Sequence, residues 1–185
     1  MAKNWHVVDA EPEPLLNGHE LTGLPSYKRV KQGLAFVPQG RMVFPFLTVE
    51  QNILTGAEHS GHRTVPDYLY RFFPVIQEMK HRKGGNLLGD PQQMLAIARA
   101  LISDPKVLSL DEPTERIQPS IIQELAQPLT VLRKERGLAI IVSEQVLSFA
   151  LDLADRFLVI DRGRIVHDEV GTNLDQDRVR SFLTI

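Results

Sequence analysis

The chain has 185 residues, with 21 Lys and Arg against 23 Asp and Glu, a net charge of -2, 43% hydrophobic residues and no cysteine. This length can bury a core as one domain, and the lack of cysteine excludes disulfides, thiolate catalysis and cysteine-ligated zinc. The nearly balanced charge disfavours a nucleic-acid-binding protein, because phosphate neutralisation requires a surplus of Lys and Arg.

The N-terminal segment, residues 1–14, is polar and ends in Glu-Pro-Glu-Pro. Proline fixes φ and restricts the residue before it, so we expect an extended tail followed by one domain over residues 15–185. The segment has no apolar region typical of secretory signals, and no apolar run in the chain reaches the about 20 residues of a membrane-spanning helix. The sequence therefore predicts neither a leader nor a transmembrane segment.

Hydrophobic periodicity predicts strands that alternate with helices along the rest of the chain. The expected strands are 33–37, 107–110 and 138–142, with a hairpin of 157–161 and 164–168. The expected helices are 48–57, 67–81, 90–103, 120–137, 146–157 and 173–185. The uninterrupted apolar run 138–142 predicts a strand buried on both faces. This order indicates an α/β fold with a mainly parallel sheet, in which residues 41–85 form a small, mainly helical insert.

Local signals predict where several of these helices begin. Thr48 and Ser120 are each followed three residues later by glutamine, which is the spacing of a capping box. Asp90 precedes a proline, which predicts Asp90 as the N-cap and the proline as the first helical residue. Pro128 lies inside the predicted helix 120–137, where it costs about 3 kcal/mol and should kink the backbone.

Two carboxylates, Asp111 and Glu112, directly follow the predicted strand 107–110, and Gln39 is expected at the tip of another strand. Open α/β sheets bind ligands at the carboxyl ends of parallel strands. There, one carboxylate can hold Mg²⁺, and its neighbour can orient or deprotonate an attacking water. On the two acids alone, a solvated turn after a core strand is the other interpretation.

Three stretches of the chain resemble, in order, motifs of the ATP-binding-cassette (ABC) ATPases. Their Q-loop region is similar to LAFVPQGRMVFPFLTVEQNILTG, their signature helix and Walker B strand to QQMLAIARALISDPKVLSLDEPTE, and their switch segment to IIVSEQV. The Glu-Gln pair of the switch segment resembles the subunits that energise branched-chain amino acid and urea importers. The urea type is favoured by GLPSYKRV, DEPTERIQPS and VRSFLTI. The resemblance covers residues 15–185 and implies an ABC-type nucleotide-binding domain.

The resemblance implies roles for four residues at the strand ends. Gln39 would be the Q-loop glutamine that senses Mg²⁺ and water and couples to a membrane subunit. Asp111 would be the Walker B acid, so that Gln39 and Asp111 form the Mg²⁺ site. Glu112 would be the general base for the water that attacks the γ-phosphate, and Glu144 would occupy the catalytic switch position.

The sequence departs from the family pattern before the Q-loop and at the signature. No glycine is followed by lysine, so the phosphate-binding GxxxxGK[ST] loop is missing, and we expect the chain to begin inside the ATPase core. Where relatives carry LSGGQ, this chain has LLGDP, with Leu88 and Gly89 at positions that would contact nucleotide. Asp90 adds a negative charge near the phosphates. Arg116 replaces a glycine of the loop that crosses the dimer interface, where a left-handed backbone penalises a side chain.

The function that the resemblance implies is ATP binding and hydrolysis in an importer for urea or branched-chain amino acids. ATP and Mg²⁺ would be the cofactors, and the partners would be membrane permease subunits and a second ATPase subunit in a head-to-tail dimer. Residues 41–85 would dock on the permease, on the cytoplasmic face of the inner membrane. The alternative is a catalytically inactive remnant that binds a permease without hydrolysing ATP. A DNA-associated cassette protein is disfavoured by the net charge.

Loss of a P-loop strand and helix should leave apolar surface uncovered. The residues expected to be exposed are Leu34, Phe36, Leu108, Leu110 and Ile141. Exposed apolar surface of this kind predicts marginal stability or aggregation. Separately, His59 and His62 beside Glu58 could bind a metal, but a Gly/Ser loop without a third fixed ligand disfavours such a site.

Overall fold

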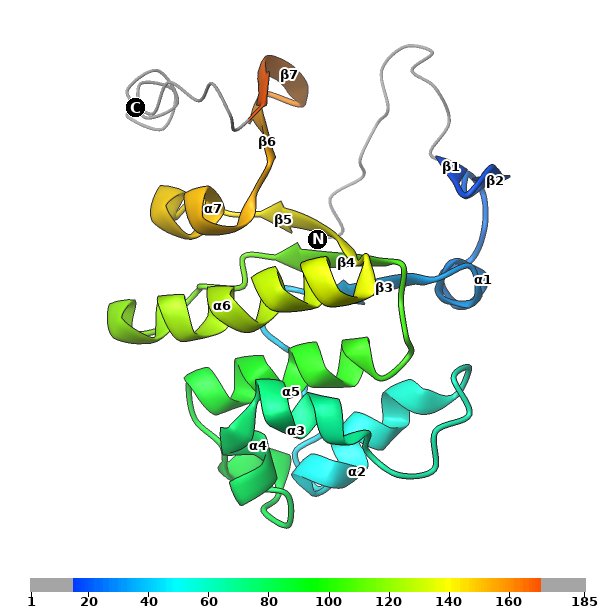
Figure 1. Cartoon of the computed structure of the whole chain (residues 1–185), viewed down its shortest axis with the longest axis vertical. Helices are drawn as coiled ribbons and strands as arrows, with labels where there is room; N and C mark the ends of the chain where they lie inside the picture. The colour runs from blue at the N-terminus through cyan, green and yellow to red at the C-terminus, as the bar shows by residue number, and fades with distance from the viewer. Residues whose placement is uncertain (1–14, 171–185) are drawn as a thin grey trace.

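The computed structural model describes residues 15–170, so the expected tail 1–14 and the expected helix 173–185 lie outside the described residues. Figure 1 shows how the elements are arranged. In chain order they are β1 (Leu15–Leu16), β2 (His19–Glu20), α1 (Ser26–Lys31), β3 (Leu34–Val37), α2 (Val49–Leu54), η1 (Thr55–Ala57), α3 (Asp67–Phe72), α4 (Pro74–Glu78), η2 (Gly84–Asn86), α5 (Asp90–Leu101), β4 (Val107–Asp111), α6 (Pro119–Arg136), β5 (Ala139–Ser143), α7 (Leu147–Leu153), β6 (Arg156–Asp161) and β7 (Arg164–Val170), where η marks a short 3-10 helix.

The strands β3, β4 and β5 form a parallel sheet with β4 in the centre. The register pairs Val37 with Leu110 and Leu110 with Val142, so the carboxyl ends of the strands lie at one edge. Parallel neighbours need crossover connections, and α6 supplies the one between β4 and β5. The expected α/β fold with a mainly parallel sheet is confirmed.

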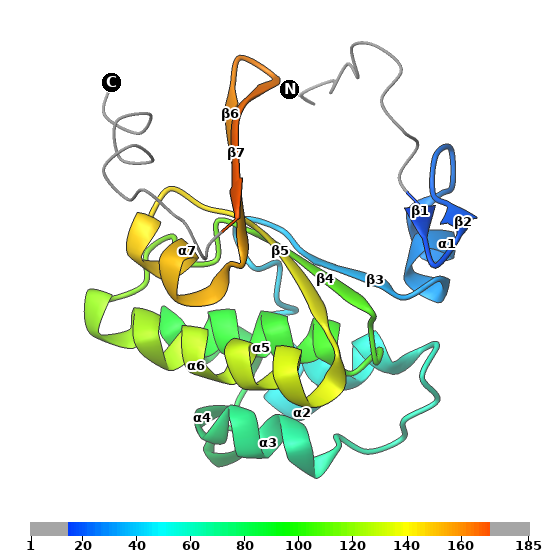
Figure 2. The same ribbon diagram turned by 45° about the horizontal axis from the view of Figure 1, so that its top comes forward.

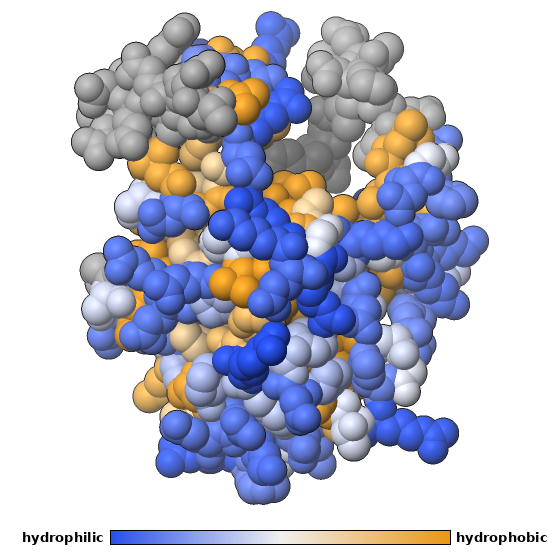
Figure 3. Space-filling view, in the orientation of Figure 1, coloured by the Kyte–Doolittle hydropathy of each residue, from blue (hydrophilic) through white to orange (hydrophobic). Residues whose placement is uncertain are grey.

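The sheet and the helices lie in successive layers. Figure 2 shows α5 and α6 beneath the sheet, with α2, α3 and α4 farther from it. The core joins these layers through buried apolar side chains, among them Ile53, Leu69, Phe73, Ile97, Leu108, Leu125 and Leu129. Figure 3 shows a mainly hydrophilic surface over the lower helices α2 to α4. The position of the helices therefore gives the sheet one covered face.

The other face of the sheet is open within residues 15–170. Phe36 on β3 is 57% exposed and Ile141 on β5 is 60% exposed, and both flank Ser109 in the strand register. The prediction of exposed apolar surface is confirmed for these two residues. It is wrong for Leu108 and Leu110, which are 0% and 1% exposed because they point toward α5 and α6. Strand side chains alternate between faces, so neighbouring residues have opposite environments.

Three sequence predictions, one about β5 and two about helix ends, are wrong. The strand β5 is an edge strand with alternating exposure instead of a strand buried on both faces. The helix α5 has Gly89 as its N-cap and begins at Asp90, and α6 begins at Pro119, so Ser120 forms no capping box. A proline at the first turn has no N–H that needs a partner, which allows α6 to start one residue earlier.

Other helix signals are confirmed. Thr48 caps α2 with both hydrogen bonds of a capping box, and Gly137 ends α6 in the left-handed conformation. The expected helix 67–81 divides at Phe73, whose φ of -129° is not helical, and α4 then starts at Pro74. Pro128 lies inside α6, as expected.

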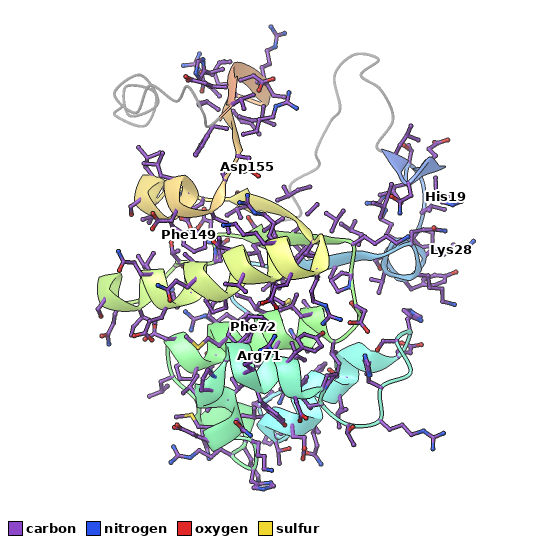
Figure 4. All side chains as sticks on the ribbon, in the orientation of Figure 1. His19, Lys28, Arg71, Phe72, Phe149 and Asp155 are labelled. Atoms are coloured by element: carbon purple, nitrogen blue, oxygen red, sulfur yellow. The ribbon has the colours of Figure 1, made fainter. Side chains whose placement is uncertain are left out.

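The hairpin of β6 and β7 stands apart from the parallel sheet in both ribbon views (Figures 1 and 2). Its register shifts between Val159 and Ile160. The preceding helix α7 anchors it to the rest of the chain, because Phe149 is fully buried and belongs to the core. Figure 4 labels Phe149 between α7 and α6.

Candidate functional site

The carboxyl edge of the sheet gathers the polar residues that sequence analysis singled out. Gln39 follows β3, Asp111 ends β4 and is followed by Glu112, and Glu144 follows β5. The register places Asp111 opposite Ser143, so the ends of β4 and β5 are adjacent. This edge is where open α/β sheets bind ligands.

Glu112 is held by two amide side chains. Gln39 Nε2 donates to Glu112 Oε2 at 2.9 Å, and Gln145 Nε2 donates to Glu112 Oε1 at 2.8 Å. The backbone N–H of Glu112 donates to the carbonyl of Ser143 at 2.8 Å. Each carboxylate oxygen thus has one neutral donor, and the three strand ends are joined through one side chain. A water could reach a free lone pair only beside these amides, or by displacing one of them.

Glu144 lies in the same region but points elsewhere. Its Oε2 accepts hydrogen bonds from the hydroxyl of Thr114 at 2.7 Å and from the backbone N–H of Thr114 at 3.2 Å. Its Oε1 accepts from the backbone N–H groups of Gln145 and Val146. The Glu144 carboxylate therefore ties the loop after β4 to the start of α7, whereas Gln145 reaches Glu112. In the sequence, Gln145 is the second residue of the Glu-Gln pair of the switch segment, and no role at the site was predicted for it.

Asp111 differs from Glu112 and Glu144 in its hydrogen bonding. It is half-buried at the end of β4, and within residues 15–170 its carboxylate has no hydrogen bond or ion pair to another side chain. Carboxylate oxygens suit Mg²⁺, which is held by one or two protein carboxylates together with water or phosphate. The donor set of Asp111 and the amide oxygen of Gln39 is compatible with such an ion. No group of three or more His, Asp or Glu within the described residues could hold a metal by itself.

Arg41, next to this site, connects three loops. Its Nε donates to Gln93 Oε1 at 3.0 Å, its Nη1 to the carbonyl of Gly89 at 2.8 Å, and its Nη2 to the carbonyl of Glu115 at 2.9 Å. Burial lowers the pKa of Arg41, although Asp90 and Glu115 act in the opposite direction. The guanidinium is always charged in proteins, so it supplies permanent donors to these loops.

A second arginine holds the backbone of the same segment. Arg99 on α5 donates to the carbonyls of Met42 and Arg41, and burial lowers its pKa. Both Arg41 and Met42 have positive φ, at 65° and 47°. Left-handed backbone is unfavourable for residues with a side chain and is found where the surroundings enforce it, often at functional sites. The hydrogen bonds of the Arg41 and Arg99 side chains hold the backbone of residues 41–42 in this conformation.

The loop between η2 and α5 carries the altered signature residues. Leu88 is 83% exposed, and Gly89 has a φ of 62° with open space around its Cβ position. Asp90 begins α5 and contributes a negative charge that acts on Arg41. The loop is tied to the strand-end site only indirectly, through Arg41. Arg116 has a φ of 57°, which confirms the left-handed backbone expected at that position.

The candidate metal ligands His59 and His62 do not form a site in the described part of the chain. His62 Nε2 lies 2.8 Å from Asp104 Oδ2, so this imidazole has a carboxylate partner on the other side of the loop. Asp104 also lies 3.4 Å from the guanidinium of Arg136. These contacts link the loop before α3 to the end of α6, which is a structural role.

Comparison with known proteins agrees with this geometry. Residues 7–115 match the family model described as "ABC transporter". The high-affinity branched-chain amino acid transport ATP-binding protein BraG of Pseudomonas aeruginosa is 41% identical over 167 residues, which cover 88% of this chain and 71% of BraG. The probable branched-chain amino acid transport ATP-binding protein LivF of Archaeoglobus fulgidus is 35% identical over 162 residues, covering 86% of this chain and 69% of LivF.

A solved structure has the same fold. It is a dimeric post-hydrolysis state of the ATP-binding cassette MJ0796 bound to ADP and Pi, with a TM-score of 0.71 and 22% identity over 84% of this chain and 71% of that one. The fold and the strand-end acids define an α/β domain of the ATP-binding-cassette type. The chain belongs to the ABC transporter family. Within residues 15–170, no helix combines the length and apolar character needed to cross a bilayer.

Proposed function

We propose that this chain is the ATP-binding subunit of an ABC importer and couples ATP hydrolysis to solute transport. The observation that carries the proposal is the convergence of Gln39, Asp111 and Glu112 at the carboxyl edge of the parallel sheet. The 41% identity to BraG supports it independently. ATP and Mg²⁺ are the proposed ligands of this edge.

Glu112 is the proposed general base. Its carboxylate would take a proton from water as the water oxygen bonds to the γ-phosphorus, while the bond from that phosphorus to the β–γ bridging oxygen breaks and ADP leaves. Gln39 and Gln145 would orient the carboxylate, and one of them would shift to admit the water. Asp111 would hold Mg²⁺, which neutralises phosphate charge when bound.

Leu88 and Gly89 are proposed to face a nucleotide at the junction with a second ATPase subunit, in a head-to-tail dimer. The exposure of Leu88 and the open space around Gly89 support an interface there. Glu144 is proposed to act in the switch segment through Thr114, because its carboxylate connects the loop after β4 with α7.

The helical part, about residues 41–85, is proposed to dock on a membrane permease, which would place the subunit on the cytoplasmic face of the inner membrane. Exposed Phe44 and Phe46 support this, since large exposed apolar groups mark interaction surfaces. The segment that carries the exposed Arg82 runs beside residues 45–49, because the Arg82 carbonyl accepts from the Val49 N–H at 2.8 Å and the Gly85 N–H donates to the Pro45 carbonyl at 3.0 Å. A Phe46→Ser variant should lose permease binding in a co-purification experiment, whereas Tyr27→Ser on α1 should retain it.

A catalytically inactive permease-binding protein is the second candidate. The observation in its favour is the altered signature segment, in which Leu88 is 83% exposed at a position that would contact nucleotide. Asp90 at the signature also repels phosphate charge. Docking through residues 41–85 would then be the remaining activity.

Steady-state phosphate release separates the two candidates. The importer proposal expects Mg-ATP hydrolysis that Glu112→Gln lowers by about 100-fold or more, since general-base catalysis contributes at least that much. Glu78→Gln, on the exposed end of α4, is the matched control and should keep full activity. No hydrolysis, together with no binding of Mg-ATP by calorimetry, supports the inactive protein.

The solute is proposed to be a branched-chain amino acid, because BraG and LivF are named for that transport. Urea is the alternative, supported by the stretches GLPSYKRV and DEPTERIQPS in this sequence. The ATPase is not expected to contact the solute, so a genetic test is appropriate. Complementation of strains that lack the ATP-binding subunit of either importer should restore growth on leucine or on urea as nitrogen source.

A further inference from the structure

A cavity of about 600 Å³ lies away from the strand-end site, between four helices. Its walls come from the end of α3 and the start of α4, the first turns of α5, and one side of α6. Figure 4 labels Arg71 and Phe72, which line it, below α6. This volume is within the range of small-molecule sites, which favour junctions between structural units.

Most of the wall is apolar. The apolar residues that define its shape are Phe72, Pro74, Met94, Ile121 and Val131. Phe72 also has the Arg71 guanidinium 5.0 Å from its ring centroid, and Arg71 Nη2 lies 3.2 Å from Glu135 Oε2. The positive charge on this wall is therefore already engaged by an aromatic ring and a carboxylate.

The cavity is lined by two carboxylates, Asp90 and Glu124, and by the neutral amide of Gln127. Asp90 lines the wall, and its Oδ1 is buried without a hydrogen-bond partner. Arg41 attracts Asp90 electrostatically, yet its guanidinium donates to Gln93, Gly89 and Glu115 instead. A buried carboxylate oxygen without a donor is costly, so a rotation of the Asp90 side chain that turns this oxygen toward a donor on a ligand gains free energy.

The α6 wall adds a second carboxylate to the cavity. Glu124 lines the cavity with an exposed carboxylate that has no ion pair within residues 15–170. Pro128, four residues later, has no N–H, so the Glu124 carbonyl lacks its usual helical donor. Because the charge of Arg71 is paired with Glu135, the remaining charged groups of the wall, Asp90 and Glu124, make the cavity negatively charged.

We propose that this cavity binds a small organic ammonium ion with an aromatic or branched apolar body. The body fills the apolar space between α3 and α6, and the ammonium donates to Asp90 and Glu124. Because the ligand contacts α4, α5 and α6 together, it stabilises the position of the helical part against the sheet. The cavity lies apart from the carboxyl edge of the sheet, and it shares Asp90 with the signature segment.

The test uses three indole probes that differ in one group, with ligand-observed NMR on the full chain. Tryptamine carries an ammonium, tryptophol a hydroxyl and indole-3-acetate a carboxylate. Tryptamine should bind about tenfold more tightly than tryptophol, the ratio expected for one charge-assisted hydrogen bond, and indole-3-acetate should bind least. Equal affinity for the three probes would overturn the proposal.

Variants locate the site. Glu124→Gln and Asp90→Asn should each reduce tryptamine binding by about five- to tenfold and leave tryptophol unchanged, whereas Glu78→Gln, outside the cavity, should alter neither. Val131→Trp should fill the cavity and remove binding of all three probes. Tryptamine binding that survives Val131→Trp would show that the ligand binds elsewhere.

A measurement on the unmodified chain covers the case in which a variant fails to fold. With methyl-labelled methionine, tryptamine should shift the resonance of Met94, which lines the cavity, and leave that of Met79 unchanged. A shift of Met79 without Met94 would contradict the proposed location. Both outcomes are independent of whether the chain hydrolyses ATP.

Discussion

The side-chain amide of Gln145 donates to Glu112 Oε1 across 2.8 Å and thereby joins the end of β5 to the end of β4. Gln39 completes the arrangement with a 2.9 Å hydrogen bond to the other oxygen. Glu112 also has a φ of 44°, so its backbone is held in the left-handed region. The position of this carboxylate thus depends on side chains from both neighbouring strand ends.

For the stability of the fold, the absence of charge on the Gln145 side chain should be more important than its size. Gln145→Glu places a second carboxylate beside Glu112, and the repulsion should lower the midpoint of urea unfolding at pH 7 more than Gln145→Met does. In about 1 M NaCl, where the repulsion is screened, the two variants should converge. The same difference between the variants at low and high salt would show that the contact with Glu112 has no electrostatic role.

Arg41 should be a larger contributor to stability than other surface arginines. Arg41→Met removes hydrogen bonds to Gly89, Gln93 and Glu115 and should lower the free energy of unfolding by about 2 kcal/mol. Arg63→Met, at an exposed position before α3, is the matched control and should change it by less than about 0.5 kcal/mol. Amide exchange of the 87–90 loop should also accelerate in Arg41→Met, and unchanged exchange there would contradict the bridging role.

Pro128 should destabilise α6. Pro128→Ala restores the N–H that reaches the Glu124 carbonyl and should raise the free energy of unfolding by about 1–3 kcal/mol. Pro119→Ala is the control, because a proline at the first helical position costs little. Chemical denaturation of both variants gives the comparison, and an equal effect at the two positions would argue against the missing hydrogen bond as the cause.

Sequence periodicity was sufficient to predict the parallel sheet and the meeting of Gln39, Asp111 and Glu112, because the topology of parallel strands brings their carboxyl ends together. It was insufficient for contacts that depend on three-dimensional loop paths. Arg41 bonds to residues 48, 52 and 74 positions away, which no local pattern encodes. After β5, Gln145 contacts Glu112, whereas Glu144 contacts Thr114. Which of the two side chains reaches Glu112 likewise depends on the path of the backbone after β5.

The open face of the sheet should promote self-association. Phe36 on β3 and Ile141 on β5 expose apolar side chains on either side of the central strand β4, so sedimentation should detect oligomers that increase with protein concentration. The double variant Phe36→Ser, Ile141→Thr should shift the distribution to monomer without loss of helical circular dichroism. Leu108→Ser, on the covered face, should instead unfold the chain. A wild-type chain that stays monomeric at every concentration would contradict this prediction.

Tyr68 should give the fold a distinct sensitivity to alkaline pH. Burial, followed by the Asp104 carboxylate, raises the pKa of Tyr68 to about 12, and its hydroxyl donates to the Leu101 carbonyl and to Asp104 Oδ1. In the unfolded chain the pKa of tyrosine is about 10. The folded state therefore favours the protonated phenol, so this contribution to stability is complete below about pH 10 and is lost as the pH rises through about 12.

The measurement is the melting temperature of wild type and Tyr68→Phe at several pH values between about 8 and 12. Tyr68→Phe should melt at a lower temperature than wild type near pH 8, because it lacks the two hydrogen bonds, and the difference should shrink toward pH 12. Tyr27→Phe, on the exposed side of α1, should follow the wild-type curve throughout. A difference between wild type and Tyr68→Phe that is constant across the range would mean that ionisation of this phenol is not linked to folding.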